Sequence, residues 1–540
     1  MLLKRVTDSI RLDALLSYAA EGLNEEATVR RLALMTAVAL ATSVIAAPAG
    51  NAAVSTDSST LRKAVTVQGI MRHQQAFQGF AEDSVATFGH PTRVDGSIGF
   101  TESADYVVRQ MRSYGYSVSV QNFTFDRFVE SAPPVFAQVA PNPTTYIEGT
   151  DFLTMEYSGS GDVTASVQAT NDIVIPPGAT ASTSNSGCEA SDFAGFTPGN
   201  IALIQRGTCT FRQKVDNATA AGAAGTIIFN EGQPGRTDAV DGTLSPPQAA
   251  IPALGTTFDL GANLYSLLQA GQTVSVHIAV TAGVVTTPSV NVIADSTGRA
   301  DRTVVVGAHL DSVTEGPGIN DNGSGSAAIL ETAKQMTKLG ITPVNRVRFA
   351  WWGGEEFGLL GSEYYVSHLG STELKNIALN LNFDMVASPN FVRFVYDGDG
   401  SATGTKGPNG SGNIEKVFTD YFTTQGLPTA ATAFDGRSDY GPFIDRGIPA
   451  GGLFTGAEGI KTAAEAAVYG GTAGAPYDAC YHQLCDDITN LNRTALDQMS
   501  DGIADATLQF AMTSSSVSGT SKASATATAS TDYAGTLLRK

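Results

Sequence analysis

One stretch, residues 304–336, constrains the fold more than any other part of the chain. It begins with a run of three valines, which suits a strand that is buried on both faces. A loop rich in glycine and asparagine follows at residues 316–325, and helical spacing predicts a helix over 326–336. His309 thus falls at the carboxyl end of a strand, and Asp321 falls in the loop before a helix. In open α/β sheets, ligands bind at this edge.

The rest of the C-terminal half repeats this alternation of strand and helix. Apolar runs such as residues 347–352 and 377–383 suit buried strands, and residues 414–425 carry helical spacing. Such alternation predicts an α/β fold in which a mixed, mainly parallel sheet is sandwiched by helices.

The start of the same domain is expected before an insertion. Within residues 54–130, helical spacing predicts one helix over 61–87 and a second over 102–114, and residues 117–125 alternate like a strand. We therefore assign residues 54–130 and 286–513 to one domain, interrupted by residues 131–285.

The insertion differs from its surroundings in composition. It starts near a pair of prolines and is rich in Thr, Ser and Gly, with short β-like runs. His277, its single histidine, lies in an alternating pattern typical of a core or edge strand position. The segment GNIALIQRGTCTFRQKVDNATAAGAAGTIIFNE resembles a protease-associated domain. Such domains usually flank a substrate cleft and perform no chemistry themselves.

The two ends of the chain are expected to lie outside the folded domains. Arg30 and Arg31 precede an apolar run and then small residues, which is the order of a secretory signal. Residues 1–53 are therefore predicted to be an N-terminal extension plus a signal peptide, and the protein to be secreted. Residues 514–540 are rich in Ser, Thr and Ala and are predicted to be a disordered tail.

The net charge limits the classes of binding partner, and the cysteine content bears on the compartment in which the protein folds. The net charge of −19 argues against nucleic acid and anionic membranes as partners. Four cysteines allow three pairings, and proximity favours Cys188–Cys209 and Cys480–Cys485 in an oxidising compartment.

Histidine and acidic residues follow several apolar runs, as metal ligands would. Each alone is better explained as a helix cap or a turn residue. Together they predict a metal site: His309, Asp321, Glu355, Glu356, Asp384 and His482. Oxygen and imidazole ligands without a thiolate suit zinc, with manganese or cobalt as alternatives. Two histidines and three carboxylates exceed one tetrahedral zinc but suit two metals sharing a bridging carboxylate, leaving one acidic residue as a general base.

The motifs GAHLDSV, GINDNGSG, WWGGEEFGLLGS, NFDM and YHQ together resemble the secreted two-zinc aminopeptidases. That family has the zinc exopeptidase fold and also includes aminopeptidase Y, glutamate carboxypeptidase II and the transferrin receptor. The resemblance implies that His309 and Asp384 bind one zinc, that Glu356 and His482 bind the other, and that Asp321 bridges both.

The same resemblance implies roles for residues around the metals. Glu355 would take a proton from the bridging water and pass it to the leaving amine. Asp311 would orient His309, as metal-bound imidazoles generally require. Tyr481 could donate to the oxyanion, and Arg437 matches a position near the substrate amine.

The expected function is a secreted, monomeric aminopeptidase that removes N-terminal residues, with Leu or another large apolar residue favoured, from peptides. A carboxypeptidase of the same fold would need an arginine cluster, and residues 430–460 offer only Arg437 and Arg446. A single-zinc glutaminyl cyclase would not need both ligand sets. A binding protein like the transferrin receptor would not need the complete ligand set.

Asp486 and Asp487 are expected to be solvated surface charges, not a calcium site.

Overall fold

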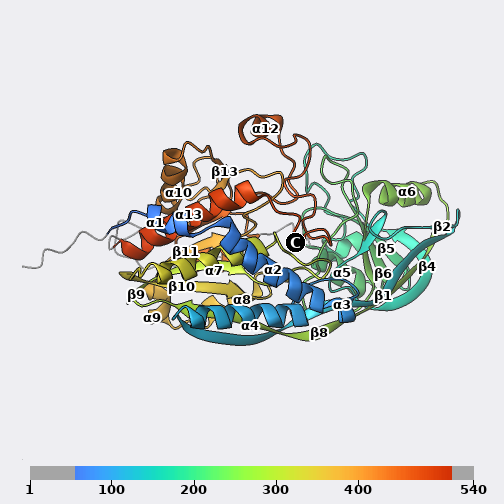
Figure 1. The fold of residues 1–540 in the computed structure, drawn as a ribbon. Coiled ribbons are helices and arrows are strands. Elements are labelled where there is room, and N and C mark those ends of the chain that lie inside the picture. The colour runs from blue at the N-terminus through green and yellow to red at the C-terminus, as the bar shows by residue number, and fades with distance from the viewer. Residues whose placement is uncertain (1–54, 514–540) are drawn as a thin grey trace, which may run out of the picture. The chain divides into compact units, whose positions relative to one another are not determined.

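The strands of the C-terminal half form a mixed sheet, as the alternation of strand and helix predicts. In this computed structural model, the central strands β9, β10, β11 and β14 run parallel, β8 pairs antiparallel with β10, and β12 pairs antiparallel with β14 but parallel with β13. Across the sheet, the order is β13 (Ala430–Thr432), β12 (Phe394–Tyr396), β14 (Ala450–Phe454), β11 (Ile377–Phe383), β9 (Arg299–His309), β10 (Asn345–Trp352) and β8 (Ser275–Asp295). Figure 1 labels β8, β9, β10, β11 and β13 of this sheet.

Helices cover both faces of this sheet, because successive strand residues point to opposite sides. Val304 and Val306 of β9 join the larger core, and Val305 between them joins the smaller core on the other face. The larger core is completed by α1 (Ser59–Ala64), α2 (Val67–Asp83), α4 (Ile98–Ser113), α7 (Gly323–Lys338), α10 (Ser411–Thr424) and α13 (Arg493–Met512). The smaller core is completed by α8 (Leu360–Ser367), α9 (Ser371–Asn376) and α11 (Gly441–Asp445). The α/β fold class is confirmed.

The structure describes residues 55–513. The predicted signal region and the predicted C-terminal tail lie outside this range. Within it, we find no helix with the length and apolar character needed to cross a membrane.

The single helix predicted over residues 61–87 is wrong, because three helices occupy this region: α1, α2 and α3 (Val85–Phe88). Thr66 has an extended backbone, and its hydroxyl accepts a hydrogen bond from the Gly69 N–H at 3.1 Å. This side chain caps the start of α2, so the apolar spacing continues although the helix does not.

Two long strands run through the expected domain boundaries. β1 (Ser117–Ala140) pairs antiparallel with β8 from Ser117 opposite Asp295 to Ala140 opposite Ser275. The register shifts on either side of Ala132, next to Pro133 and Pro134. Proline has no N–H to donate to a ladder, so the change in composition coincides with irregular pairing inside a continuous strand.

The inserted segment builds a second small sheet with its own cores. Strands β5, β6 and β7 are parallel, β3 adds an antiparallel edge, and β4 connects this sheet to β8. Its elements are β2 (Thr144–Thr145), which pairs with β1, β3 (Phe152–Thr154), β4 (Gly161–Ala169), β5 (Ile201–Gln205), α5 (Phe211–Ala220), β6 (Gly225–Phe229), β7 (Ala253–Thr256) and α6 (Phe258–Gln269). His277 on β8 faces the Asp162 carboxylate at 2.8 Å, which fits its predicted structural role.

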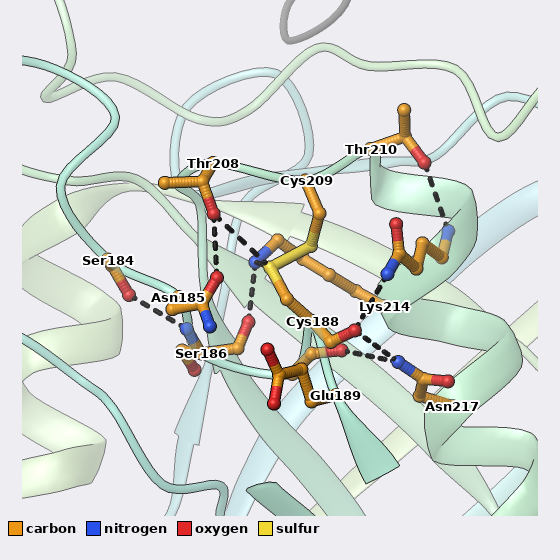
Figure 2. The surroundings of a disulfide bond; sticks show 12 residues. Ser184, Asn185, Ser186, Cys188, Glu189, Thr208, Cys209, Thr210, Lys214 and Asn217 are labelled. Atoms are coloured by element: carbon orange, nitrogen blue, oxygen red, sulfur yellow. Dashed lines mark hydrogen bonds between the residues drawn. A yellow bond between two sulfur atoms is a disulfide. The ribbon is translucent and has the colours of Figure 1, made fainter.

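Both predicted disulfides form, Cys188–Cys209 and Cys480–Cys485. Figure 2 shows the first, which joins the segment before β5 to the start of α5. The Cys188 carbonyl accepts hydrogen bonds from Gln213 and Asn217 of α5, and the Lys214 ammonium donates to the Ser186 carbonyl beside it. The disulfide therefore closes a loop over the N-terminal turns of α5.

Replacing Cys188 and Cys209 with serine is expected to destabilise the inserted segment by about 3 kcal/mol, because the closed loop no longer restricts the unfolded chain. Thermal unfolding followed by circular dichroism would measure the lower midpoint. The pocket described below should keep its shape at 25 °C, since neither cysteine lines it. An unchanged midpoint would contradict this prediction.

Candidate metal centre and active site

Three neighbouring strands bring most of the candidate ligands to one edge of the sheet. His309 is the last residue of β9, Asp384 directly follows β11, and Glu355 and Glu356 follow β10 after a glycine pair. Because β11, β9 and β10 are adjacent and parallel, their carboxyl ends meet at one edge. Gly354 has a φ of +66°, a conformation that a larger residue rarely adopts, and it lets the chain turn after β10.

The carboxylate of Asp321 lies between the two histidines. Its Oδ1 is 3.2 Å from His309 Nε2, and its Oδ2 is 3.3 Å from His482 Nε2. On the outer sides, His309 Nε2 is 3.2 Å from Asp384 Oδ1, and His482 Nε2 is 3.1 Å from Glu356 Oε2. The cluster thus contains two pairs of one imidazole and one carboxylate, with Asp321 shared between them.

The loop that carries Asp321 is anchored on both sides. The peptide bond between Asp321 and Asn322 is cis. Asn322 caps α7 by accepting a hydrogen bond from the Gly325 N–H, and its amide donates to the Phe383 carbonyl at the end of β11. Asn322 therefore links the Asp321 loop to the strand that precedes Asp384.

Asp486 anchors the same loop from the other side, so the expectation that it is a solvated surface charge is wrong. It is 2% exposed, and its two carboxylate oxygens accept the N–H groups of Asn320 and Asp321, each at 2.9 Å. The Asn490 amide donates to Asp486 and also to Asp478. Asp486 directly follows the Cys480–Cys485 loop that carries His482, so it connects the two segments.

Asp311 contacts the candidate ligand His309, and Ser438 contacts the candidate ligand Asp384. Asp311 is fully buried, with its main-chain oxygen 3.2 Å and its carboxylate 3.6 Å from His309 Nδ1. The same carboxylate accepts the Glu356 N–H at 3.2 Å. Ser438 donates to the outer oxygen of Asp384 at 2.6 Å. These contacts restrict the orientation of one imidazole and one carboxylate.

The electrostatics of the cluster favour bound cations. Burial and the charge of Asp321 raise the pKa of Glu356 to about 8. Burial alone would lower the pKa of His482, but Glu356 and Asp321 raise this pKa to about 11. Burial would likewise lower the pKa of His309, but Asp384 and Glu355 raise it well above its ordinary value. Buried carboxylates therefore outnumber the groups that could neutralise them.

Unsatisfied oxygens point to the same conclusion. Within residues 55–513, Glu356 Oε1 and Asp311 Oδ1 are buried without a hydrogen-bond partner. Carboxylate oxygens of this kind are rarely left without a partner in native proteins. Candidate ligand atoms of His309, Asp321 and Glu356 lie within 4.8 Å of one another, and so do those of His309, Glu355 and Asp384. The donor set fits divalent metal ions that prefer nitrogen and oxygen.

A pocket opens over the cluster, and both remaining predicted site residues line it. The Arg437 guanidinium donates to Glu458 at 2.7 Å and to the Tyr481 hydroxyl at 3.1 Å. The Tyr481 ring stacks on His482, with centroids 3.8 Å apart. The structure therefore brings together all nine residues that the sequence singled out.

Comparison with known proteins agrees with this arrangement. Residues 291–507 match the model of peptidase family M28, and residues 169–264 match that of the PA domain. An aminopeptidase of Pseudomonas aeruginosa is 47% identical over 427 residues, covering 78% of this chain and 77% of its own. The chain belongs to peptidase family M28. A leucine aminopeptidase 2 of Arthroderma otae is 40% identical to this M28 peptidase, over 84% of this chain and 85% of its own.

Solved structures show the same fold. The aminopeptidase from Aneurinibacillus sp. strain AM-1 superposes on this M28 peptidase with a TM-score of 0.67 and 27% identity, covering 84% of this chain and 96% of its own. BSAP, a zinc aminopeptidase from Bacillus subtilis, gives a TM-score of 0.58 at 24% identity, covering 82% and 94%. This M28 peptidase is a metal-dependent aminopeptidase with an inserted PA domain, and its substrates are peptides.

The sequence did not indicate several residues that hold the candidate ligands and their loops in this M28 peptidase: Arg93, Asp95, Asn322, Ser438, Asp478, Asp486 and Asn490. Arg93, Asp95 and Asp486 bind backbone groups of distant loops, and a backbone N–H or carbonyl leaves no trace in the sequence. Asn322 is the exception, because an asparagine at the predicted start of a helix is a recognisable cap.

Proposed function

We propose that this enzyme is a secreted aminopeptidase that uses two zinc ions to remove Leu or another large apolar residue from the N-terminus of peptides. The position of Asp321 between His309 and His482 carries this proposal. A carboxylate with one oxygen toward each imidazole suits a bridge between two ions.

Each ion would take one imidazole and one carboxylate in addition to the bridge. His309 and Asp384 would hold the first, and Glu356 and His482 would hold the second. Nitrogen and oxygen donors without a thiolate suit zinc, with manganese and cobalt as alternatives. The zinc aminopeptidase of Bacillus subtilis, which shares the fold, supports zinc. When bound, the ion pair would polarise the scissile carbonyl and lower the pKa of the attacking water.

Glu355 is proposed as the general base. It is 3% exposed, lines the pocket and lies 3.9 Å from His309 Nε2, close enough to the candidate ligands to reach a water among them. In this position it would accept the proton of the attacking water and then deliver it to the leaving amine. Asp311 would keep His309 oriented through its contacts with Nδ1.

Tyr481 and Arg437 would act on the other side of the scissile bond. The Tyr481 hydroxyl accepts a hydrogen bond from Arg437, so its own proton is free to point toward an oxyanion in the pocket. A guanidinium repels an ammonium group, so Arg437 is proposed to hold Tyr481 and the substrate main chain. The α-amine would then be attracted by the carboxylates of the pocket, including Glu458.

The walls of the pocket support a preference for apolar residues. They include Met385, Phe394, Tyr396, Phe454 and Tyr477. A branched aliphatic side chain placed against these groups would leave water, which favours binding. The leucine aminopeptidase of Arthroderma otae supports the same preference.

A carboxypeptidase is the nearest alternative, and the charge of the pocket disfavours it. Arg437 is the one arginine among the described residues that line the pocket, and it already pairs with Glu458. Asp321, Glu355, Glu356 and Asp384 also line the pocket and make it acidic. An acidic pocket attracts a free amine and repels a terminal carboxylate.

Domain limits and location are part of the proposal. The family matches at residues 291–507 and 169–264 support a catalytic domain formed by 54–130 and 286–513, with the PA domain at 131–285. Two disulfides suit an oxidising environment and support secretion. The enzyme is proposed to act as a monomer and without a membrane partner.

Removing the metal with a zinc chelator is expected to abolish release of nitroaniline from Leu-nitroanilide, and added zinc should restore it. Leu-nitroanilide should be cleaved at least about tenfold faster than Glu-nitroanilide, because an apolar pocket discriminates by 1–3 kcal/mol. N-acetyl-Leu-nitroanilide is the matched control and should resist cleavage. Equal cleavage of the blocked substrate would exclude an aminopeptidase, and no cleavage of any substrate would favour a binding protein.

A further inference from the structure

A four-residue segment far away in the sequence contacts two loops of the metal centre. Residues 92–95 connect α3 to α4, and all four side chains are fully buried. They lie more than 200 residues before the loops they contact. We call residues 92–95 the brace.

The Arg93 guanidinium holds the loop between two candidate ligands. Its Nε donates to the Pro317 carbonyl at 2.8 Å, Nη1 donates to the Leu310 carbonyl, and Nη2 donates to the Gly318 carbonyl. Leu310 directly follows His309, and Gly318 lies three residues before Asp321. One side chain therefore binds the first and the later parts of the loop that separates these two ligands.

The rest of the brace extends this contact to the strand that leads to Glu355. The Arg93 N–H donates to the Ser312 hydroxyl at 2.9 Å, and the Thr92 hydroxyl donates to the Val313 carbonyl at 2.9 Å. Asp95 accepts the N–H of Gly354, the residue before Glu355, at 2.8 Å. The brace thus joins the loop after β9 to the turn after β10.

Only an arginine suits the central position of the brace. Its planar fork presents donors in several directions, whereas lysine presents three donors from one nitrogen. A buried cation is costly unless charges of opposite sign lie near it. The carboxylates of Asp311, Asp321, Glu356 and Asp486 supply that charge here. The Phe77 ring of α2 lies under the guanidinium, 5.4 Å from its carbon.

We propose that Arg93 is a positioning residue of the metal centre, which sets the separation of His309 and Asp321 by clamping the loop between them; this inference rests on the proposed ligand roles of those two residues. Arg93 lies outside the pocket lining, so it acts through the loop. Its loss should weaken metal binding and slow turnover without changing the affinity for the apolar side chain of the substrate.

The test is Arg93→Lys in the full-length holoenzyme. Changes of hydrogen-bond partners behind metal ligands typically cost 10–100-fold, so zinc affinity in competition with a chelator should fall by about that factor. The kcat for Leu-nitroanilide should fall similarly, with KM within about threefold of the original. The visible absorption bands of the cobalt-substituted enzyme should shift, because they report the geometry around the metal.

Arg348→Lys is the matched control. Arg348 is also a poorly exposed arginine of the catalytic domain, and it binds Asp295 through two hydrogen bonds along β10 and β8. This variant should lose thermal stability but keep the zinc affinity and the cobalt spectrum. A purely structural role for Arg93 would make the two variants alike.

The inference would be overturned if Arg93→Lys kept the zinc affinity, the cobalt spectrum and the kcat of the original enzyme. If the original enzyme itself bound no zinc, the proposed function would be overturned instead. If Arg93→Lys does not fold, Thr92→Val provides the second test, because at nearly constant volume it removes the hydrogen bond that the Thr92 hydroxyl donates to the Val313 carbonyl and the one that it accepts from the Val94 N–H. Zinc affinity should then fall by about twofold or more, as the loss of these hydrogen bonds implies, and an unchanged value would reject the brace.

Discussion

Replacing Glu355 with glutamine is expected to leave both metal ions bound and to lower kcat by about 10²–10⁴-fold. Glutamine has nearly the same shape as glutamate, so the turn after β10 and the hydrogen bond from Gly354 to Asp95 should persist. The amide cannot accept and release a proton at neutral pH, and that is the step assigned to Glu355. Metal analysis by native mass spectrometry and steady-state kinetics with Leu-nitroanilide would measure both effects.

The adjacent Glu356→Gln variant is the matched control, because it makes the same chemical change one residue further on. Glu356 lies 3.1 Å from His482 Nε2, as a ligand of the same ion would. This variant should therefore lose affinity for one metal, which the Glu355 variant should keep. Near-normal turnover by Glu355→Gln would remove Glu355 from the role of base and leave the metal assignment intact.

Replacing Asp321 with alanine is expected to lower the affinity for both metals and to reduce kcat by about a thousandfold or more, since a metal pair supplies several kcal/mol of catalysis. One carboxylate faces both His309 and His482, so its removal affects both ions at once. The loop itself should remain in place. Its main chain is held by Asp486 through the Asp321 N–H and by Arg93 through the Gly318 carbonyl, and neither contact uses the Asp321 side chain.

Asp384→Ala separates a shared ligand from a terminal one. Of the two histidines, Asp384 contacts only His309, so this variant should weaken the binding of one ion more than the binding of the other. Native mass spectrometry and isothermal titration with zinc would show one strong site in Asp384→Ala and none in Asp321→Ala. Two tightly bound ions in Asp321→Ala would refute the bridging role.

Much of the fold was predictable because its main signal is local. Three valines before His309 indicate a buried strand whatever the rest of the chain does, and β9 ends at that histidine. The same argument places Asp384 after β11 and Glu355 after β10. The error at residues 61–87 has a local cause too: Thr66 caps a new helix without interrupting the apolar spacing.

The contacts between loops were not predictable. Asp486 follows a cysteine and precedes another aspartate, a setting typical of a surface turn, yet it is buried against the Asp321 loop. Pro133 and Pro134 indicated a change of domain, yet β1 continues past them by shifting its pairing with β8. In both cases the contacting segment lies more than 100 residues away in the sequence. Asp486 binds a backbone N–H of the Asp321 loop, and β1 pairs with the backbone of β8.

The sequence by itself determined the strand-and-helix alternation, the edge of the sheet at which the chemistry lies, and the residue types available there. These follow from apolar periodicity and from the rule that parallel strands end at a common edge. Only the tertiary structure decided that Asp321 faces both histidines and that Arg93, Asp95 and Asp486 hold the loops around it. The physical reason is that these side chains bind backbone N–H and carbonyl groups. Every residue offers a carbonyl and nearly every residue an N–H, so folding alone selects which of them a buried side chain meets.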